Sequence, residues 1–139
     1  ETGTLTLTDP RMTRFWLTLE QGVEFVLRAI EDMQGGETFV PRIPSMRMSD
    51  LAQAMAPECQ QKIIGIRPGE KLHECLVSEH EARNARDDVS RIVILPSRPT
   101  WPLDRWDDRP GLPEGYRYTS DANDQWLSAD QLREMVREN

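Results

Sequence analysis

The four residues Arg67-Pro68-Gly69-Glu70 have types and spacing suited to binding a polar ligand. Pro-Gly predicts a turn, and a turn at the end of a strand places Arg67 and Glu70 on the same side. The guanidinium can make forked hydrogen bonds to a phosphate, and the carboxylate can accept bonds from the vicinal hydroxyls of a ribose. Opposite charges at this spacing suit the two ends of a nucleoside diphosphate. An ordinary turn with an exposed Arg–Glu pair explains the same residues.

A second cation lies in the segment Met12–Trp16, where Arg14 precedes two aromatic residues. The Asp9-Pro10 pair breaks the chain before it, so we expect this segment to be extended or a loop. Arg14 could clamp the same diphosphate from the other side. Alternatively, Phe15 and Trp16 lie in the core and Arg14 stacks over a ring. The residues alone leave both interpretations open.

Other patterns with chemical potential are weak. His73, Cys75 and His80 have no regular metal-ligand spacing. The acidic residues between Asp104 and Asp108 fit a solvated, proline-rich loop better than a pair of catalytic carboxylates. The chain contains no G-x-S-x-G elbow, no G-x-G-x-x-G after a strand and no P-loop. We therefore expect no catalytic residue, no metal site and no dinucleotide site in this chain.

Alternating strands and helices are predicted to position these residues. Short strands are expected over 5–8, 37–40 and 62–66, and helices from Thr18 to the glycines at 35–36 and over 49–56. This alternation predicts an α/β fold. The first helix carries an exposed Glu24–Arg28 pair and groups its apolar residues on one face (Leu19, Val23, Val26, Leu27 and Ile30). In the second helix, Ser49 is the expected cap, with Leu51, Ala52 and Met55 on the inner face.

The second half of the chain is less regular. An extended stretch over 72–78 is expected to pair with a strand over 91–95, across a polar connection at 79–86. A proline-rich arm over about 96–118 is expected to be packed by Trp101 and Trp106. A terminal helix over about 128–138 begins at the cap Ser128, with Leu132, Met135 and Val136 inward. We interpret residues 1–139 as one substrate-binding region.

Length and charge limit the classes of function. A chain of 139 residues can bury roughly two-thirds of its unfolded surface. Its formal net charge of −7 argues against nucleic acid or an anionic membrane as the main partner. No apolar run approaches a membrane span and no secretory signal opens the chain, so a cytoplasmic location is expected. Cys59 and Cys75 are interpreted as two reduced thiols.

Several long motifs in register resemble the extended short-chain dehydrogenase/reductases. These are TDPRMTRFW (Thr8 to Trp16) continuing through LEQGVEFVL, then GGETFVPRIPSMRMSDLA, GIRPGEKLHE (Gly65 to Glu74) and YTSDANDQWLS (Tyr118 to Ser128). Within that family the chain is most similar to the C-terminal part of the inverting UDP-N-acetylglucosamine 4,6-dehydratases, which belong to the polysaccharide biosynthesis proteins and act in pseudaminic acid and related surface-sugar pathways. The stretch between Arg83 and Arg91 departs from the subgroup, because relatives carry more aromatics there.

The resemblance implies how the parent enzyme works. An N-terminal Rossmann domain holds NADP and carries a Tyr-x-x-x-Lys pair; the hexose is oxidised at carbon 4, water is lost across carbons 5 and 6, and hydride returns to carbon 6 with inversion at carbon 5. The C-terminal part grips the UDP. By motif position, Arg14 and Arg67 contact the diphosphate and Glu70 binds the ribose, with Thr13 and Lys71 beside them. Neither the glycine-rich loop nor Tyr-x-x-x-Lys occurs in this chain.

The sequence therefore predicts the UDP-sugar-binding part of such a lyase, inactive alone and completed by the missing N-terminal Rossmann domain. The resemblance leaves a homo-oligomer open, because dimers and hexamers are familiar in the family. One alternative is a stand-alone binding or assembly module derived from the family. Another is part of a related UDP-sugar epimerase.

Overall fold

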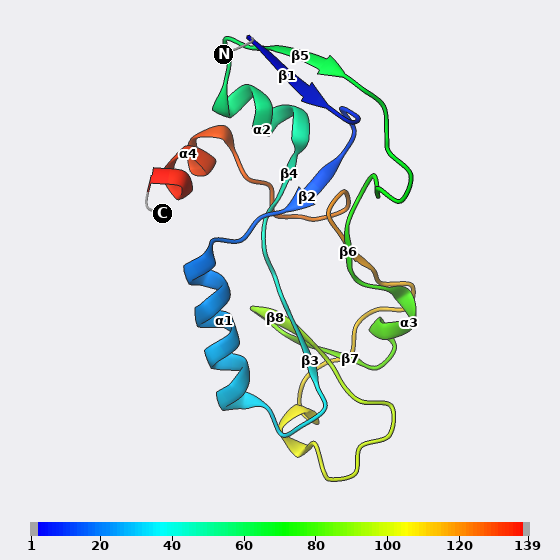
Figure 1. The fold of residues 1–139 in the computed structure, drawn as a ribbon. Coiled ribbons are helices and arrows are strands. Elements are labelled where there is room, and N and C mark those ends of the chain that lie inside the picture. The colour runs from blue at the N-terminus through cyan, green and yellow to red at the C-terminus, as the bar shows by residue number, and fades with distance from the viewer. Residues whose placement is uncertain (1–2, 138–139) are drawn as a thin grey trace. The chain divides into compact units, whose positions relative to one another are not determined.

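The computed structural model describes residues 3–137 and shows a mixed α/β fold of short strands and helices (Figure 1). The α/β class expected from the sequence is confirmed. The chain divides into two compact units. Unit 1 contains residues 3–18, 43–74 and 119–137, and unit 2 contains residues 19–42 and 75–118.

Unit 1 contains two small sheets. β1 (Thr4–Leu7) pairs in parallel with β5 (Gln60–Ile63), and β2 (Thr13–Phe15) pairs antiparallel with β4 (Ser45–Arg47). The strand expected over 62–66 begins two residues earlier and ends at Ile63. The four-residue register with β1 sets its length, and Gly65, at φ +86°, turns the backbone out of the extended region. The segment around Arg14, expected to be extended or a loop, is partly strand, because β4 supplies a pairing partner.

Two helices pack against each other in unit 1. α2 (Met48–Met55) and α4 (Ala129–Arg137) enclose a core of Met46, Ala54 and Leu132. The Ser128 cap is confirmed, because its hydroxyl accepts a hydrogen bond from the backbone N–H of Gln131 at 3.3 Å. The backbone N–H of Ser128 in turn donates to the side-chain oxygen of Gln131 at 2.9 Å.

Three details of these helices were predicted wrongly. Ser49 does not cap α2, since the helix already begins at Met48 and its N-cap position falls on Arg47. Met55 is exposed because it is the last residue of α2, and Ala54 takes the buried position. Val136 is also exposed, near the end of α4, while Leu132 is buried as expected.

Unit 2 is built on an antiparallel sheet in which β8 (Arg91–Ile94) lies between β3 (Thr38–Pro41) and β7 (Ala85–Asp88). The expected pairing of 72–78 with 91–95 is wrong, because both edges of β8 are occupied. Instead, β6 (Cys75–Val77) pairs with β9 (Tyr118–Thr119). The connection expected over 79–86 forms the short helix α3 (Glu79–Ala82) and then enters β7.

The core of unit 2 surrounds Trp106. This residue is 1% exposed, ends the 3-10 helix η1 (Asp104–Trp106) and packs with Val93 and Leu103 against Phe39. The proline-rich arm is therefore packed by Trp106, as expected. Trp101 remains half exposed and lies against Gly35. A Cβ atom at position 35 would come within 2.5 Å of the Trp101 ring, so the contact requires glycine there.

An ion-pair cluster surrounds Arg91 in the same unit. The Arg91 guanidinium bonds to Asp32 and to Asp88, and it lies 5.0 Å from the ring centre of Phe39. The hydrogen bond from Arg91 and its charge hold the pKa of Asp32 below its ordinary value. This cluster ties the end of α1 (Leu19–Asp32) to β8.

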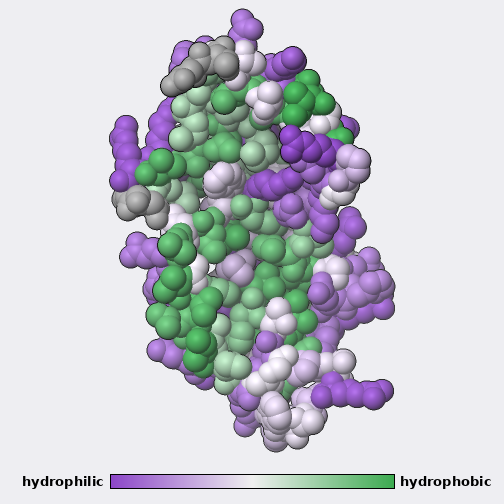
Figure 2. Space-filling view, viewed as in Figure 1, coloured by the Kyte–Doolittle hydropathy of each residue, from purple (hydrophilic) through white to green (hydrophobic). Residues whose placement is uncertain are grey.

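Helix α1 ends ahead of Gly35 and Gly36, and its Glu24–Arg28 ion pair is present, both as expected. None of its residues is buried. The apolar face identified from the sequence is exposed, and Figure 2 shows hydrophobic atoms gathered along this helix. Among the helices of residues 3–137, none is long and apolar enough to cross a membrane.

Candidate functional site

The turn that carries the candidate phosphate ligand has the geometry that Pro-Gly predicts. The backbone N–H of Glu70 donates to the carbonyl of Arg67 at 3.1 Å, and Gly69 adopts φ +87°. A positive φ at the third position of a four-residue turn, after proline, is the type II arrangement that requires glycine. The turn follows β5 on the surface of unit 1.

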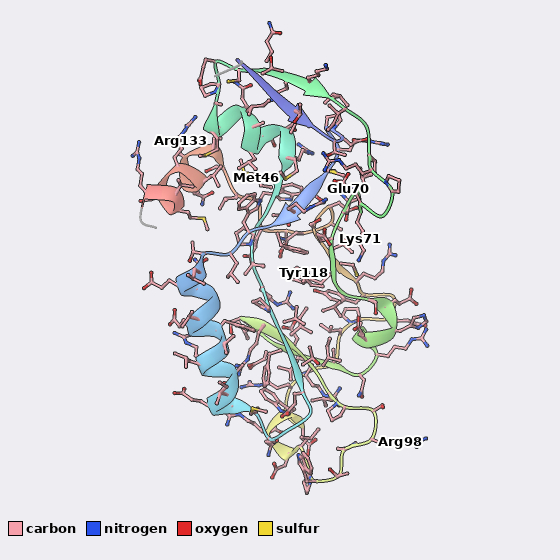
Figure 3. All side chains as sticks on the ribbon, in the orientation of Figure 1. Met46, Glu70, Lys71, Arg98, Tyr118 and Arg133 are labelled. Atoms are coloured by element: carbon pink, nitrogen blue, oxygen red, sulfur yellow. The ribbon has the colours of Figure 1, made fainter. Side chains whose placement is uncertain are left out.

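The two charged ends of this turn do not pair with each other. The Glu70 carboxylate accepts from the backbone N–H of Arg67 at 2.9 Å, so it closes the turn instead of neutralising the guanidinium. Within residues 3–137, the Arg67 side chain is exposed and has no ion pair or hydrogen bond. Lys71 is exposed beside it, and Figure 3 shows Glu70 and Lys71 on the loop after β5. The cation that an anion would need is therefore available.

Arg14 is placed differently, with its guanidinium turned onto the protein. It donates to the carbonyls of Thr13 at 2.7 Å, Lys71 at 2.9 Å and Leu72 at 3.2 Å, and its Nε lies 3.4 Å from the Glu74 carboxylate. A guanidinium has five N–H donors, so these contacts use most of them. In this structure Arg14 holds the loop that follows the Arg67 turn.

Thr13 is the centre of a buried hydrogen-bonded group. Its side chain is 3% exposed, and its hydroxyl lies 2.6 Å from the Ser120 hydroxyl and 2.8 Å from Nδ1 of His73. Ser120 is fully buried, accepts from the backbone N–H of Glu74 at 2.9 Å and donates to the carbonyl of Thr13 at 3.2 Å. The group joins β2, the loop at 71–74 and the segment after β9.

A hydroxyl, an imidazole and a carboxylate in sequence resemble a hydrolytic triad, because Nε2 of His73 lies 4.0 Å from Asp121. The hydroxyls of Thr13 and Ser120 are buried, however, so a substrate cannot reach them. A hydrogen bond from Thr119 holds the pKa of Asp121 below its ordinary value. The arrangement fits positioning, not nucleophilic catalysis.

The sequence did not predict the role of Ser120, His73 or Glu74. Ser120 lies inside the run YTSDANDQWLS and His73 inside GIRPGEKLHE. The sequence spacing of neither residue predicts which side chain it contacts. Their contacts with Thr13 span 107 and 60 residues of sequence. Only the folded chain brings them together.

Two arrangements that bind dinucleotides and metals in other proteins are not found in the described part of the chain. A dinucleotide pyrophosphate needs a glycine-rich turn leading into a helix whose first turn is not acidic. The connections from strands into α1–α4 contain no glycine, and each of these helices has an acidic residue in its first turn. Residues 3–137 also contain no group of three or more His, Cys, Asp or Glu that could hold a metal ion.

The fold and the site thus define a mixed α/β protein with an exposed cationic turn suited to an anionic ligand. The model of the family described as polysaccharide biosynthesis protein matches residues 1–96, so the chain belongs to that family.

Similar proteins agree with this family. The UDP-N-acetylglucosamine 4,6-dehydratase (inverting) of Campylobacter jejuni serotype O:2 is 42% identical over 95% of this chain. A UDP-glucose 4-epimerase of Rickettsia felis is 39% identical over 66% of the chain. The chain spans only 42% of the length of the dehydratase and 28% of the epimerase. The resemblance to the inverting dehydratases found in the sequence is confirmed.

A solved structure shares the fold. The X-ray structure of Pen from Bacillus thuringiensis has a TM-score of 0.78 and 26% sequence identity. The similarity covers 99% of this chain and 41% of that chain. A similar fold therefore occurs as part of a longer protein.

Proposed function

We propose that this chain is the UDP-sugar-binding part of an inverting UDP-N-acetylglucosamine 4,6-dehydratase, acting in the synthesis of surface-polysaccharide sugars such as pseudaminic acid. The observation that carries the proposal is the unpaired Arg67 guanidinium on a hydrogen-bonded type II turn, with the exposed Lys71 directly after the turn in the chain. A guanidinium held this way can bind a diphosphate through two parallel hydrogen bonds. The dehydratase match extends over both residues.

Each proposed ligand has a distinct task. Arg67 binds the diphosphate, and Lys71 adds a second positive charge. Glu70 uses one carboxylate oxygen to close the turn, and its other oxygen can accept from a ribose hydroxyl. Arg14 reaches the diphosphate by exchanging the carbonyls of Lys71 and Leu72 for phosphate oxygens, which are stronger acceptors for a guanidinium. Thr13 holds the loop from inside.

The redox chemistry lies outside this chain under the same proposal. NADP would supply and recover the hydride in the parent enzyme, held by the N-terminal Rossmann domain. The residues of this chain bind the UDP and orient the sugar. The sequence holds neither the glycine-rich loop nor the Tyr-x-x-x-Lys pair, so under this proposal the isolated chain should have no turnover.

The test is a calorimetric titration of the 139-residue chain with UDP. We expect weak binding, with a Kd on the order of 1 mM, which corresponds to about 4 kcal/mol. Arg67→Ala should abolish it. Arg98→Ala is the matched control, because Arg98 is also an exposed arginine on a loop (Figure 3) and lies in unit 2. Equal affinities for Arg67→Ala and the unmodified chain would refute the proposed site.

The titration also separates the proposal from a stand-alone binding module. A dedicated module should hold UDP tightly without a second domain, whereas a part of an enzyme should not. Turnover of UDP-N-acetylglucosamine by this chain with NADP would refute the inactivity.

An epimerase is the second candidate, favoured by the Rickettsia felis similarity. The dehydratase match covers 95% of the chain and the epimerase match only 66%, so the extent of the similarity favours the dehydratase. The experiment is a chimera, in which this chain replaces the matching segment of the Campylobacter jejuni dehydratase. Loss of water from UDP-N-acetylglucosamine by the chimera supports the proposal. A chimera that binds UDP but eliminates no water favours the epimerase.

A further inference from the structure

Helix α1 presents two different faces. Gly22, Phe25, Ala29 and Asp32 are partly covered, and they recur every three to four residues along one side. A second stripe follows the same periodicity on another side and is exposed. Its members and exposed fractions are Leu19 (81%), Val23 (52%), Val26 (54%), Leu27 (57%), Ile30 (59%) and, just beyond the helix, Met33 (48%).

Helix α1 gains little stability from the residues that pack against it in this chain. A helix of 14 residues is marginally stable alone in water and is normally stabilised by burying its apolar face. No residue of α1 is buried, and its strongest fixed point is Asp32 at the last residue, bonded to Arg91 and Arg105. A contiguous row of large apolar side chains of this length marks an interaction surface.

The charges around the stripe favour one kind of partner. The stripe contains no charged residue, and Glu20, Glu24 and Glu31 lie along one flank of it. A two-fold antiparallel pair of these helices would bring the same acidic flank of each copy together, which is unfavourable. A second copy of the chain is therefore a poor occupant. An apolar surface without matching acidic residues is a better one.

We infer that the α1 stripe docks on an apolar surface of the remaining part of the full-length protein. The family match includes α1, and this chain spans 42% of the Campylobacter jejuni dehydratase and 41% of Pen, so more than half of each relative is available to cover it. A helix that is covered on one face and apolar on another is a helix that lies between two layers. The inference rests on the proposed function, because it assumes that the apolar partner surface belongs to the remaining part of a dehydratase.

The experiment measures hydrogen–deuterium exchange of the α1 amides in the 139-residue chain and in the chimera with the Campylobacter jejuni dehydratase. We expect fast exchange in the chain and slowing by at least about 100-fold in the chimera. Val26→Gln with Ile30→Gln should remove the protection. Gln forms helix at least as well as Val or Ile, so the loss cannot come from helix propensity. Glu24→Gln with Glu31→Gln, on the acidic flank, is the matched control and should keep it.

Other occupants have distinct signatures. Slow exchange in the monomeric 139-residue chain would show that the chain covers its own stripe, and protection that grows with concentration alongside dimers in sedimentation would show a second copy. Either result overturns the inference. If the chimera does not fold, the same measurement on the Campylobacter jejuni dehydratase decides, because fast exchange in its matching helix overturns the inference too.

UDP titration of the chimera separates the two proposals. The titration reports on the Arg67 turn in unit 1, whereas exchange reports on α1 in unit 2. Protected α1 without UDP binding refutes the proposed function and leaves the docking surface. UDP binding with unprotected α1 refutes the docking surface and leaves the proposed function.

Discussion

The buried group around Thr13 allows a double-mutant cycle. Thr13→Val keeps the shape of the side chain and removes the hydroxyl that bonds to Ser120 and His73. A hydrogen bond contributes about 1 kcal/mol net to stability, and an unsatisfied buried partner costs about 1–3 kcal/mol. We therefore expect Thr13→Val to lower the free energy of unfolding by about 2 kcal/mol. Ser120→Ala removes the acceptor of the Glu74 amide as well and should cost about 3 kcal/mol.

The double variant decides whether the two hydroxyls act together. Both single variants break the bond between Thr13 and Ser120, which are 2.6 Å apart. The double variant loses this bond once, so it should cost about 1 kcal/mol less than the sum of the single variants. The free energy of unfolding is measured by urea denaturation, followed through tryptophan fluorescence, to which Trp16 and Trp126 in unit 1 contribute.

The control cycle combines Thr13→Val with Ser78→Ala. Ser78 caps α3 in unit 2 and shares no partner with Thr13, so these two changes should be additive within about 0.5 kcal/mol. Additivity of the same quality between Thr13→Val and Ser120→Ala would refute the shared hydroxyl bond. Hydrogen exchange at the Glu74 amide, which should accelerate in Ser120→Ala, gives an independent readout.

Three further predictions follow from individual contacts. Arg91→Met should lower the free energy of unfolding by about 2 kcal/mol, because it removes the largely buried cation that Asp32 and Asp88 share and leaves each carboxylate only a more exposed arginine, Arg105 or Arg109. Arg28→Met should cost about 0.5 kcal/mol or less by the same urea denaturation. Hydrogen bonds from the side chain and backbone of Arg11 lower the pKa of Asp9 to about 2, so their stabilisation is complete above the ordinary pKa of 3.8 and disappears as the pH falls toward 2. Arg11→Gln removes the guanidinium and keeps the backbone donor, so carboxyl NMR titration should show the pKa of Asp9 raised toward 3.8. Gly69→Ala should cost about 1–2 kcal/mol and weaken UDP binding in calorimetry, because the residue holds φ +87°; unchanged affinity would show that the turn is not the site.

The sequence by itself determined the features that depend on neighbouring residues. Pro68-Gly69 specified the turn because only glycine adopts its third position freely. Ser128 specified the start of α4, and the glycines at 35–36 the end of α1. The long motifs identified the family, which the comparisons confirm. The assignment of Arg14, Arg67, Glu70, Thr13 and Lys71 to a UDP site stays a prediction.

Only the tertiary structure decided which groups remain available for a ligand. Arg14 and Arg67 are both arginines in short motifs, yet the Arg14 guanidinium bonds to carbonyls almost 60 residues away and the Arg67 guanidinium bonds to nothing in the described chain. The tertiary structure also decided that Thr13 is buried against Ser120, that β7 pairs with β8 and that one face of α1 is exposed. Turn and cap preferences act over three or four residues, whereas these contacts depend on how segments far apart in the sequence pack together.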